Sequence, residues 1–340
     1  MNTMNSAITM NANVSTNTSA TLPMGESLKQ RKRSMIDLCT NTAKLLGQPL
    51  LFGLTTSLVL QEVPLPACDL DMTALHTVSS SPDKRIRKKA PSAQTQTQVR
   101  TQPHVWKQLN NERILRINKH VFAIDLFSTW AQMADHVDLM QLVILGDSII
   151  NAAEQQQPVS MRGNGTALRD KLISMTLGLS PFRGKRLCTL AAPLLMPNAA
   201  SPKESEIRLR LLQHDVPLPR TNYVVPNATF KSGSAMTLDL AWPEFRVAVE
   251  YDGDQHRTDK TQWYRDQQKR DWLQNHGWRI FVANAATLAD EASHEEFAWR
   301  LSRNLIANGA RFTFLLTPRP LNKVAKRLAR GQVKRDPTKA

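Results

Sequence analysis

The sequence predicts a mixed α/β protein with two folded parts, and three observations support this. The chain has 340 residues, which is enough for two domains of ordinary size. Residues 34–197 carry mainly helical spacing of apolar residues. From residue 198 the pattern changes to short strands that alternate with helices, in the order α-β-β-β-α-β-α. We therefore expect a mostly helical α+β domain over residues 34–197, of unclear role, and an α/β domain over 198–310.

Both ends of the chain are predicted to lie outside these domains. Residues 1–33 are rich in Asn, Ser and Thr and are expected to be a disordered tail. This tail ends in a basic cluster that can touch phosphate or simply face solvent, formed by Lys29, Arg31, Lys32 and Arg33. Residues 318–340 hold eight Lys or Arg and one Asp. We expect this segment to be a flexible basic tail.

Helical signals dominate the first domain. Apolar residues recur at helical spacing from Met35 to Leu46, and a second helix is expected from Leu54 to Val63. One short strand is expected from Asp71 to Val78, followed by a basic loop or hairpin over residues 79–103. Two consecutive helices are expected within 121–150, and further helices at 161–177 and 182–195.

The second domain begins after a predicted linker at residues 197–202. Strands are expected at 223–225, 236–241, 245–251 and 278–283, and helices at 203–214, 258–276 and 291–308. Pro243 and Glu244 separate the second and third strands, which indicates a hairpin. Gly277 is expected to end the helix that precedes the last strand.

The charge of the chain bounds its partners. The formal net charge is +15, which favours a polyanion, and nucleic acid is the first choice. No apolar run approaches the roughly 20 residues that span a bilayer, and the N-terminus lacks the features of a secretory signal. Three widely spaced cysteines form neither a disulfide framework nor a zinc pattern. We expect a cytoplasmic protein with reduced thiols and no membrane partner.

The predicted hairpin collects carboxylates. Side chains alternate between the two faces of a strand, so Glu250 and Asp252 share one face of their strand, opposite the valines. A register that pairs the two strands brings Asp239 near Glu250. Hard cations such as Mg²⁺ take carboxylate oxygens together with substrate phosphate, and a bound Mg²⁺ activates an attacking water. A metal site is favoured over a solvated acidic face, because crowded carboxylates repel one another unless a cation compensates.

Basic and titratable residues follow the hairpin. His256 lies after a glycine turn and is a candidate general acid or base, or a phosphate contact. The segment beyond it supplies Arg257, Arg265, Lys269 and Arg270 as candidate nucleic-acid contacts. An equally open alternative is a salt-bridged surface, with Asp266 and Asp271 as partners.

The segment DLAWPEFRVAVEYDGDQHR at 239–257, followed by RDWLQNHGWR at 270–279, resembles the very-short-patch-repair-like (Vsr-like) endonuclease domains of actinobacterial proteins. These belong to the PD-(D/E)XK, or restriction-endonuclease-like, superfamily. The resemblance covers 201–308 and implies a mixed sheet flanked by helices and Mg²⁺-dependent phosphodiester hydrolysis, with Mn²⁺ as an alternative metal. It implies that Asp239 and Glu250 bind the metal and that Glu204 lies on the opening helix near the site.

The motif departs from the superfamily pattern at one position. The lysine expected two residues after the strand glutamate is Asp252 here, and we expect His256 to supply the missing function. The N-terminal half resembles the region, labelled as abortive-infection type IV antitoxin-like, that precedes such domains. That resemblance is carried by Gln48-Pro49-Leu50-Leu51, Leu54, Leu65-Pro66 and the helical stretch from Asp125 to Ile150.

Three functions follow as hypotheses. The first is a Mg²⁺-dependent endodeoxyribonuclease in repair, restriction or phage defence. The second is a DNA-binding regulator or antitoxin-like component of a defence locus, with an idle nuclease fold and a partner protein from that locus. An RNA-directed protein ranks last, because the sequence has no RNA-recognition signature of the aromatic-sheet kind. The sequence does not define the oligomeric state.

Overall fold

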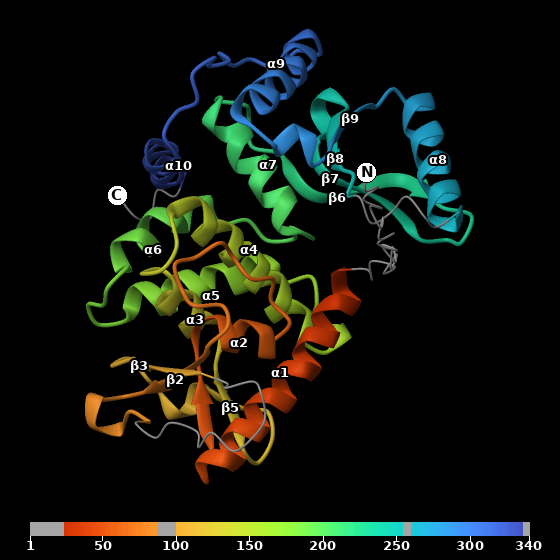
Figure 1. Cartoon of the computed structure of the whole chain (residues 1–340). Coiled ribbons are helices and arrows are strands. Elements are labelled where there is room, and N and C mark those ends of the chain that lie inside the picture. The colour runs from red at the N-terminus through yellow and green to blue at the C-terminus, as the bar shows by residue number, and fades with distance from the viewer. Residues whose placement is uncertain (1–23, 87–99, 254–259, 336–340) are drawn as a thin grey trace, which may run out of the picture.

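The structure is a computed structural model that describes residues 24–86, 100–253 and 260–335. It is a mixed α/β protein, as predicted, and it contains two mixed sheets (Figure 1). The first sheet lies in the N-terminal part, residues 24–197, and the second lies in the C-terminal part, residues 198–310. No helix in the described part of the chain is both long and apolar enough to cross a bilayer.

The N-terminal sheet has five strands in the order β3-β2-β1-β5-β4. They are β1 (Leu50–Phe52), β2 (Leu75–Ser79), β3 (Thr101–Val105), β4 (Ile114–Arg116) and β5 (Val121–Ile124). The pairs β1–β5 and β2–β3 are parallel, and β1–β2 and β4–β5 are antiparallel. Helix α1 (Met24–Leu46) packs Cys39, Ala43 and Leu46 against this sheet.

The other helices of this part form one apolar core. They are α2 (Leu54–Leu60), α3 (Leu126–Met133), α4 (Leu139–Gln155), α5 (Gly165–Gly178) and α6 (Lys185–Ala191). Asp125 and Asp138 begin α3 and α4 by accepting hydrogen bonds from backbone N–H groups of the first turn. Trp130 is buried in this core, and its ring N–H donates to the Leu142 carbonyl at 2.9 Å.

The C-terminal sheet has four strands in the order β6-β7-β8-β9. They are β6 (Arg220–Thr229), β7 (Ala235–Trp242), β8 (Val247–Tyr251) and β9 (Arg279–Ala283). The first three are antiparallel neighbours, and β8 and β9 are parallel. Helices α7 (Pro202–Gln213) and α9 (Glu291–Ala307) share one core with β7 and β8. Helix α8 (Lys260–Asn275) packs Leu273 into a second core with Ala241 and Ala248, so both faces of the sheet are covered.

The predicted element order of this domain, α-β-β-β-α-β-α, is confirmed. Its hairpin turn is Pro243–Phe245, and Arg246 takes a left-handed backbone conformation with φ of 49°. Gly277, with φ of 75°, ends α8 as predicted, because this left-handed conformation suits a residue without a Cβ atom.

Helix α7 belongs to both parts of the molecule. Ile207 and Leu211 pack on the C-terminal sheet, whereas Leu209 and Leu212 pack with the helices of the N-terminal part. Between these faces lies Arg208, which is fully buried and bonds to Asp147 of α4 at 2.7 Å. The two parts therefore share a continuous interior.

Polar groups around Asp147 complete this junction. Its carboxylate accepts hydrogen bonds from the Ser205 hydroxyl at 2.7 Å and from the Met196 backbone N–H at 2.8 Å. Arg208 also donates to the Leu194 carbonyl at 3.0 Å. Burial raises the pKa of Asp147, and the charge of Arg208 and these hydrogen bonds oppose the rise. These bonds anchor residues on both sides of the segment 197–202, which was predicted as a linker.

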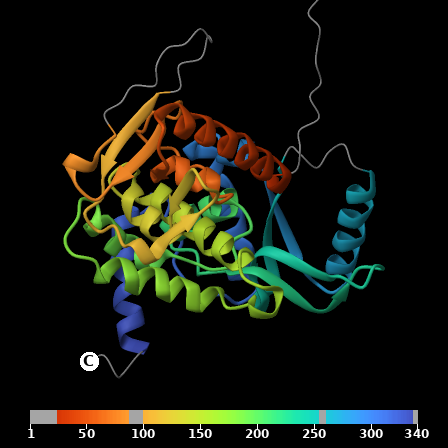
Figure 2. The ribbon, with the colours of Figure 1, turned by 90° about the horizontal axis from the view of Figure 1, so that it is seen from below.

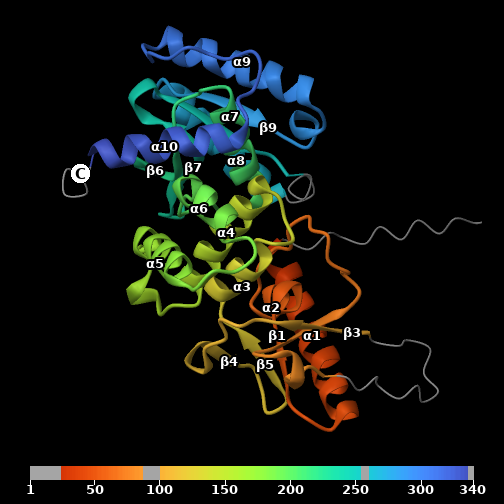
Figure 3. The ribbon, with the colours of Figure 1, turned by 90° about the vertical axis from the view of Figure 1, so that its left-hand side faces the viewer.

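Both predicted tails need correction. Helix α1 begins at Met24, so the basic cluster from Lys29 to Arg33 lies on a helix and not in a disordered tail. Residues 321–335 form helix α10 (Leu321–Arg335), and the prediction of a flexible tail is wrong there. Leu321, Val324 and Ala325 pack on the core of the N-terminal helices. Figure 3 shows α10 lying across the molecule between α6 and α9.

The N-terminal part also contains more strand than predicted. Residues 121–124 were expected to be helical but form β5. Strand β3 (residues 101–105) begins inside the segment 79–103 that was expected to be a basic loop or hairpin. These strands are short, and a short apolar run does not reveal by its spacing whether it is a strand or a helix.

Replacing Arg208 with alanine is predicted to destabilise the whole molecule. The change leaves the Asp147 carboxylate buried without its cation, which typically costs about 3–5 kcal/mol. Urea unfolding measures the free energy. The matched control is Arg210→Ala, which breaks a partly exposed ion pair with Glu206 on the same helix and is expected to cost about 1 kcal/mol. Equal losses in the two variants would contradict the role given to the buried pair.

Candidate active site

The hairpin of β7 and β8 opens at one end. Their paired residues run from Trp242 opposite Val247 to Leu240 opposite Val249. One step further along this register, Asp239 comes opposite Glu250. There the Tyr251 N–H donates to the Asp239 carboxylate at 2.8 Å, while β8 continues its pairing with β9. The two strands therefore separate where their acidic residues begin.

Glu204 approaches this opening from the first turn of α7. Its backbone N–H donates to the Ser201 hydroxyl at 3.3 Å, and its carboxylate accepts from the Ala200 N–H at 2.9 Å. These bonds resemble a capping box, with the glutamate bonded to the residue before the N-cap Ser201, and such a cap alone would explain a glutamate here. However, Glu204 is only 6% exposed. A glutamate that served only as a helix cap would be expected to stay in contact with solvent.

Electrostatics show that the three acids share one environment. Burial and the negative charge of Asp239 raise the pKa of Glu204 to about 7, with a smaller contribution from Glu250. Burial likewise raises the pKa of Glu250; Lys269 opposes this rise, and Asp239 and Asp266 add to it. Residues from α7, β7, β8 and α8 thus act on one another, although they are far apart in the sequence.

Lys269 of α8 forms an ion pair with Glu250. Only 15% of the Lys269 side chain and 21% of the Glu250 side chain are exposed, so this pair is largely shielded from water. Figure 2 shows α8 at the right-hand edge of the molecule, away from the N-terminal helices. The sequence assigned Lys269 to nucleic-acid contact, whereas the structure places it on the strand carboxylate.

Each carboxylate is therefore held by a local donor: the Ala200 N–H, the Tyr251 N–H or the Lys269 ammonium group. Across the described residues, no three histidine, cysteine, aspartate or glutamate side chains are grouped around a common point that would hold a metal ion. The donor chemistry still fits a hard cation, because clustered carboxylate oxygens are the ligands that Mg²⁺ prefers.

The other predicted site residues are only partly gathered here. Asp252 is half-buried just beyond β8, and its backbone N–H donates to the Ala283 carbonyl at 2.7 Å. Arg265 donates to the Ser234 hydroxyl at 3.1 Å and lies 4.8 Å from the centroid of the Phe230 ring, so it contacts the β6–β7 hairpin.

Arg270 is exposed on α8 and is not part of the carboxylate cluster. His256 and Arg257 lie outside the described residues. The roles predicted for these residues stay predictions.

Two features of the site were not predicted. The pairing of Lys269 with Glu250 depends on how α8 lies on the sheet, which the sequence does not reveal. The absence of lysine at position 252 was the one available signal that a cation would have to come from another element. The hydrogen bond from the Tyr251 N–H to Asp239 forms because the two strands separate there. The alternation of apolar and polar residues along a strand does not show such a separation.

No known family model matches the sequence, and no solved structure matches it. Two uncharacterized proteins of Mycobacterium tuberculosis, one from each of two strains, are each 32% identical to the chain over 129 residues. The aligned region spans 36% of this chain and 45% of each relative. The chain thus covers less than half the length of these relatives, and the chemistry of the site rests on its own residues.

The raised pKa of Glu204 predicts a pH-dependent stability. A carboxyl with a folded pKa of about 7 and an ordinary value of 4.5 binds its proton more tightly in the folded state. Its contribution is complete below about pH 4.5 and is lost as the pH rises through about 7. Replacing Glu204 with glutamine keeps the hydrogen bond and should raise the free energy of unfolding at pH 8, relative to wild type, by on the order of 2 kcal/mol.

Unfolding in urea at pH 5 and pH 8 measures this difference. Glu206→Gln is the control on the same helix, because the partners Lys203 and Arg210 lower the pKa of Glu206 against the effect of its burial. That variant should lose stability at pH 8 relative to wild type. A Glu204→Gln variant with the pH profile of wild type would contradict the raised pKa.

Proposed function

We propose that this protein is a metal-dependent endonuclease that hydrolyses phosphodiester bonds in DNA. The observation that carries the proposal is the convergence of Glu204, Asp239 and Glu250 beside Lys269. Two of these partly buried acids, Glu204 and Glu250, have raised pKa values, and residues with perturbed pKa values occur preferentially at functional sites. The resemblance of 201–308 to very-short-patch-repair-like endonucleases supports the same chemistry and a restriction-endonuclease-like fold.

In this proposal Asp239 and Glu250 hold Mg²⁺, or Mn²⁺. A bound Mg²⁺ supplies charge that polarises the phosphodiester and makes water a stronger nucleophile. Glu204, with a pKa of about 7, is suited to accept a proton from the attacking water near neutral pH. If Glu250 bound the metal, the Lys269 ammonium group would be free to stabilise negative charge on the phosphate.

The basic character of the chain supports nucleic acid as the substrate. A net charge of +15 gives affinity for phosphate that does not depend on sequence. We therefore expect binding to weaken steeply as the salt concentration rises. DNA rather than RNA is proposed on the strength of the resemblance.

A second function is favoured by one specific observation. The ion pair of Lys269 with Glu250 satisfies the strand carboxylate without any metal, which is how an idle nuclease fold would keep its acids. A DNA-binding regulator or antitoxin-like protein of a defence locus is the corresponding alternative. It predicts DNA binding without cleavage.

Nicking of supercoiled plasmid distinguishes the two functions. Wild-type protein with Mg²⁺ or Mn²⁺ is expected to nick DNA, and EDTA should abolish nicking. Asp239→Asn and Glu250→Ala should each lower the rate by about 100-fold or more, because each removes a ligand of the proposed metal ion.

The matched control is Glu244→Ala, which removes an exposed acid at the turn of the same hairpin, where it pairs with Arg220. This variant should nick like wild type. If wild type binds plasmid, single-stranded and mismatched DNA but cleaves none of them with either metal, the regulator replaces the nuclease. Cleavage of RNA alone would overturn the choice of DNA.

A further inference from the structure

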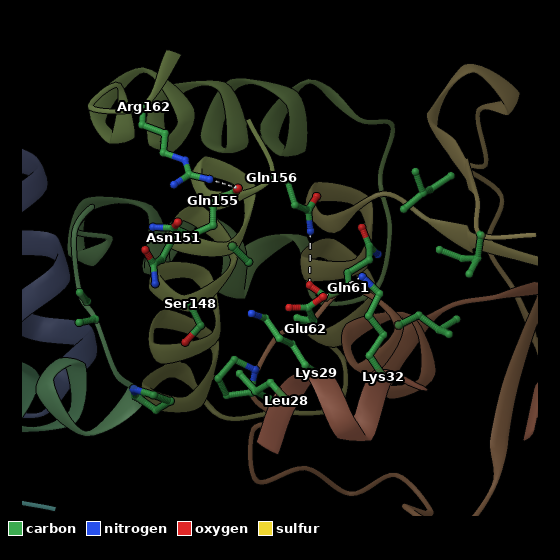
Figure 4. A pocket seen from close by; sticks show the side chains of 18 residues that line it. Leu28, Lys29, Lys32, Gln61, Glu62, Ser148, Asn151, Gln155, Gln156 and Arg162 are labelled. Atoms are coloured by element: carbon green, nitrogen blue, oxygen red, sulfur yellow. Dashed lines mark hydrogen bonds and ion pairs between the residues drawn. The ribbon is translucent and has the colours of Figure 1, made fainter. Parts of the chain in front are cut away.

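A large cavity lies between the N-terminal helices and the start of α7 (Figure 4). Its volume is about 870 Å³, within the roughly 300–1,000 Å³ range of sites that bind small molecules. Helix α1 forms one side, the end of α2 and the residues after it form another, and the C-terminal half of α4 forms a third.

The lining of this cavity is positively charged. The lining includes three cationic side chains: Lys29 and Lys32 of α1, and Arg162, which follows α4. Glu62 is the only carboxylate among the lining residues, and it is paired with Lys32 at 2.8 Å. Lys29 and Arg162 therefore leave an excess of positive charge.

Arg162 is held in place for this role. Its guanidinium donates to the Gln155 carbonyl at 2.9 Å and to the Gln157 carbonyl at 3.4 Å. These bonds satisfy carbonyl groups at the end of α4 and fix the side chain beside the cavity. A fixed guanidinium loses little entropy when it binds phosphate.

The remaining lining suits a nucleobase. Asn151 and Gln155 offer side-chain amides that, within the residues described, make no hydrogen bond. An amide both donates and accepts, which matches the edge of a base. Pro64 and Ile117 add apolar surface on which the face of a base can lie.

The cavity also adjoins the candidate active site. Ala200 and Pro202 line it, and the Ala200 N–H donates to the Glu204 carboxylate at 2.9 Å. The segment 199–202 thus forms a wall of the cavity on one side and holds a site carboxylate on the other.

We propose that this cavity binds a nucleotide unit of the nucleic acid, with the phosphates on either side of the unit at Lys29 and at Arg162 and its base against Asn151 and Gln155. This inference rests on the proposed nucleic-acid substrate. It assigns the N-terminal part a direct role in seating the strand next to the carboxylates. A free nucleotide shares this chemistry, and the test distinguishes the two sources.

The test measures binding of fluorescein-labelled single-stranded DNA by anisotropy, in EDTA so that no cleavage occurs. The double variant Lys29→Ala with Asn151→Leu should bind about tenfold more weakly, because it loses a charged contact and an amide contact. Lys29→Glu alone, at an exposed position, should show a similar loss and covers the case in which the double variant does not fold. Arg31→Ala removes the same charge from another face of α1, outside the cavity, and should change affinity less than about twofold.

Competition with a free 5′-phosphorylated dinucleotide identifies the source of the ligand. Displacement of DNA in wild type, lost in Lys29→Glu, shows that the cavity takes free nucleotides as well as a strand. If DNA binding depends on the cavity residues but the free dinucleotide does not displace the DNA, the cavity binds only a nucleic-acid strand. Equal losses for Lys29→Ala/Asn151→Leu and Arg31→Ala overturn the inference.

This result is independent of whether the protein is a nuclease. If the cavity variants lose DNA binding and the wild-type protein does not nick DNA, the proposal for the cavity is supported and the proposed nuclease activity is rejected. If nicking depends on Glu250 and the cavity variants bind DNA like wild type, the proposed nuclease activity is supported and the proposal for the cavity is rejected.

Discussion

The buried ion pair between Arg208 and Asp147 is the interaction on which the rest of the structure depends. It fixes α7 between the N-terminal helices and the C-terminal sheet, with both partners fully buried. Ser205, one residue after Glu204, bonds to the same carboxylate. The position of Glu204 at the opening of the hairpin is therefore set from the N-terminal part. A change in the packing of α4 would be felt at the proposed site.

At the site itself, burial and the repulsion between like charges destabilise the ionised carboxylates, whereas local hydrogen-bond donors stabilise them. Asp239 and Glu250 raise the pKa of Glu204, and backbone N–H groups or Lys269 hold the three carboxylates. A divalent cation would replace the Lys269 charge at Glu250 and relieve the repulsion between the acids. The same exchange would free a lysine for phosphate. Binding of the metal at Glu250 and of the phosphate at Lys269 would then both favour separation of this ion pair.

The C-terminal domain was predictable because its signals are local. Alternation in 245–251 and the proline turn predicted the hairpin that brings Asp239 opposite Glu250, and Gly277 predicted the end of α8. The partner of Lys269 was not predictable, since it depends on how a helix lies on a sheet. Residues 321–335 were misjudged because their many charges concealed an apolar stripe, formed by Leu321, Val324 and Ala325. The buried Arg208 gave no signal, because a lone arginine in a helical segment is usually exposed.

The central claim is that Asp239 and Glu250 bind a metal ion beside Glu204. Anomalous diffraction from crystals grown with Mn²⁺ tests it most directly. The account predicts a Mn²⁺ peak bound by Asp239 and Glu250 beside Glu204, with the Lys269 ammonium group moved away from Glu250. An intact pair of Lys269 with Glu250, and no Mn²⁺ at the carboxylates at a concentration that saturates carboxylate sites, would contradict it.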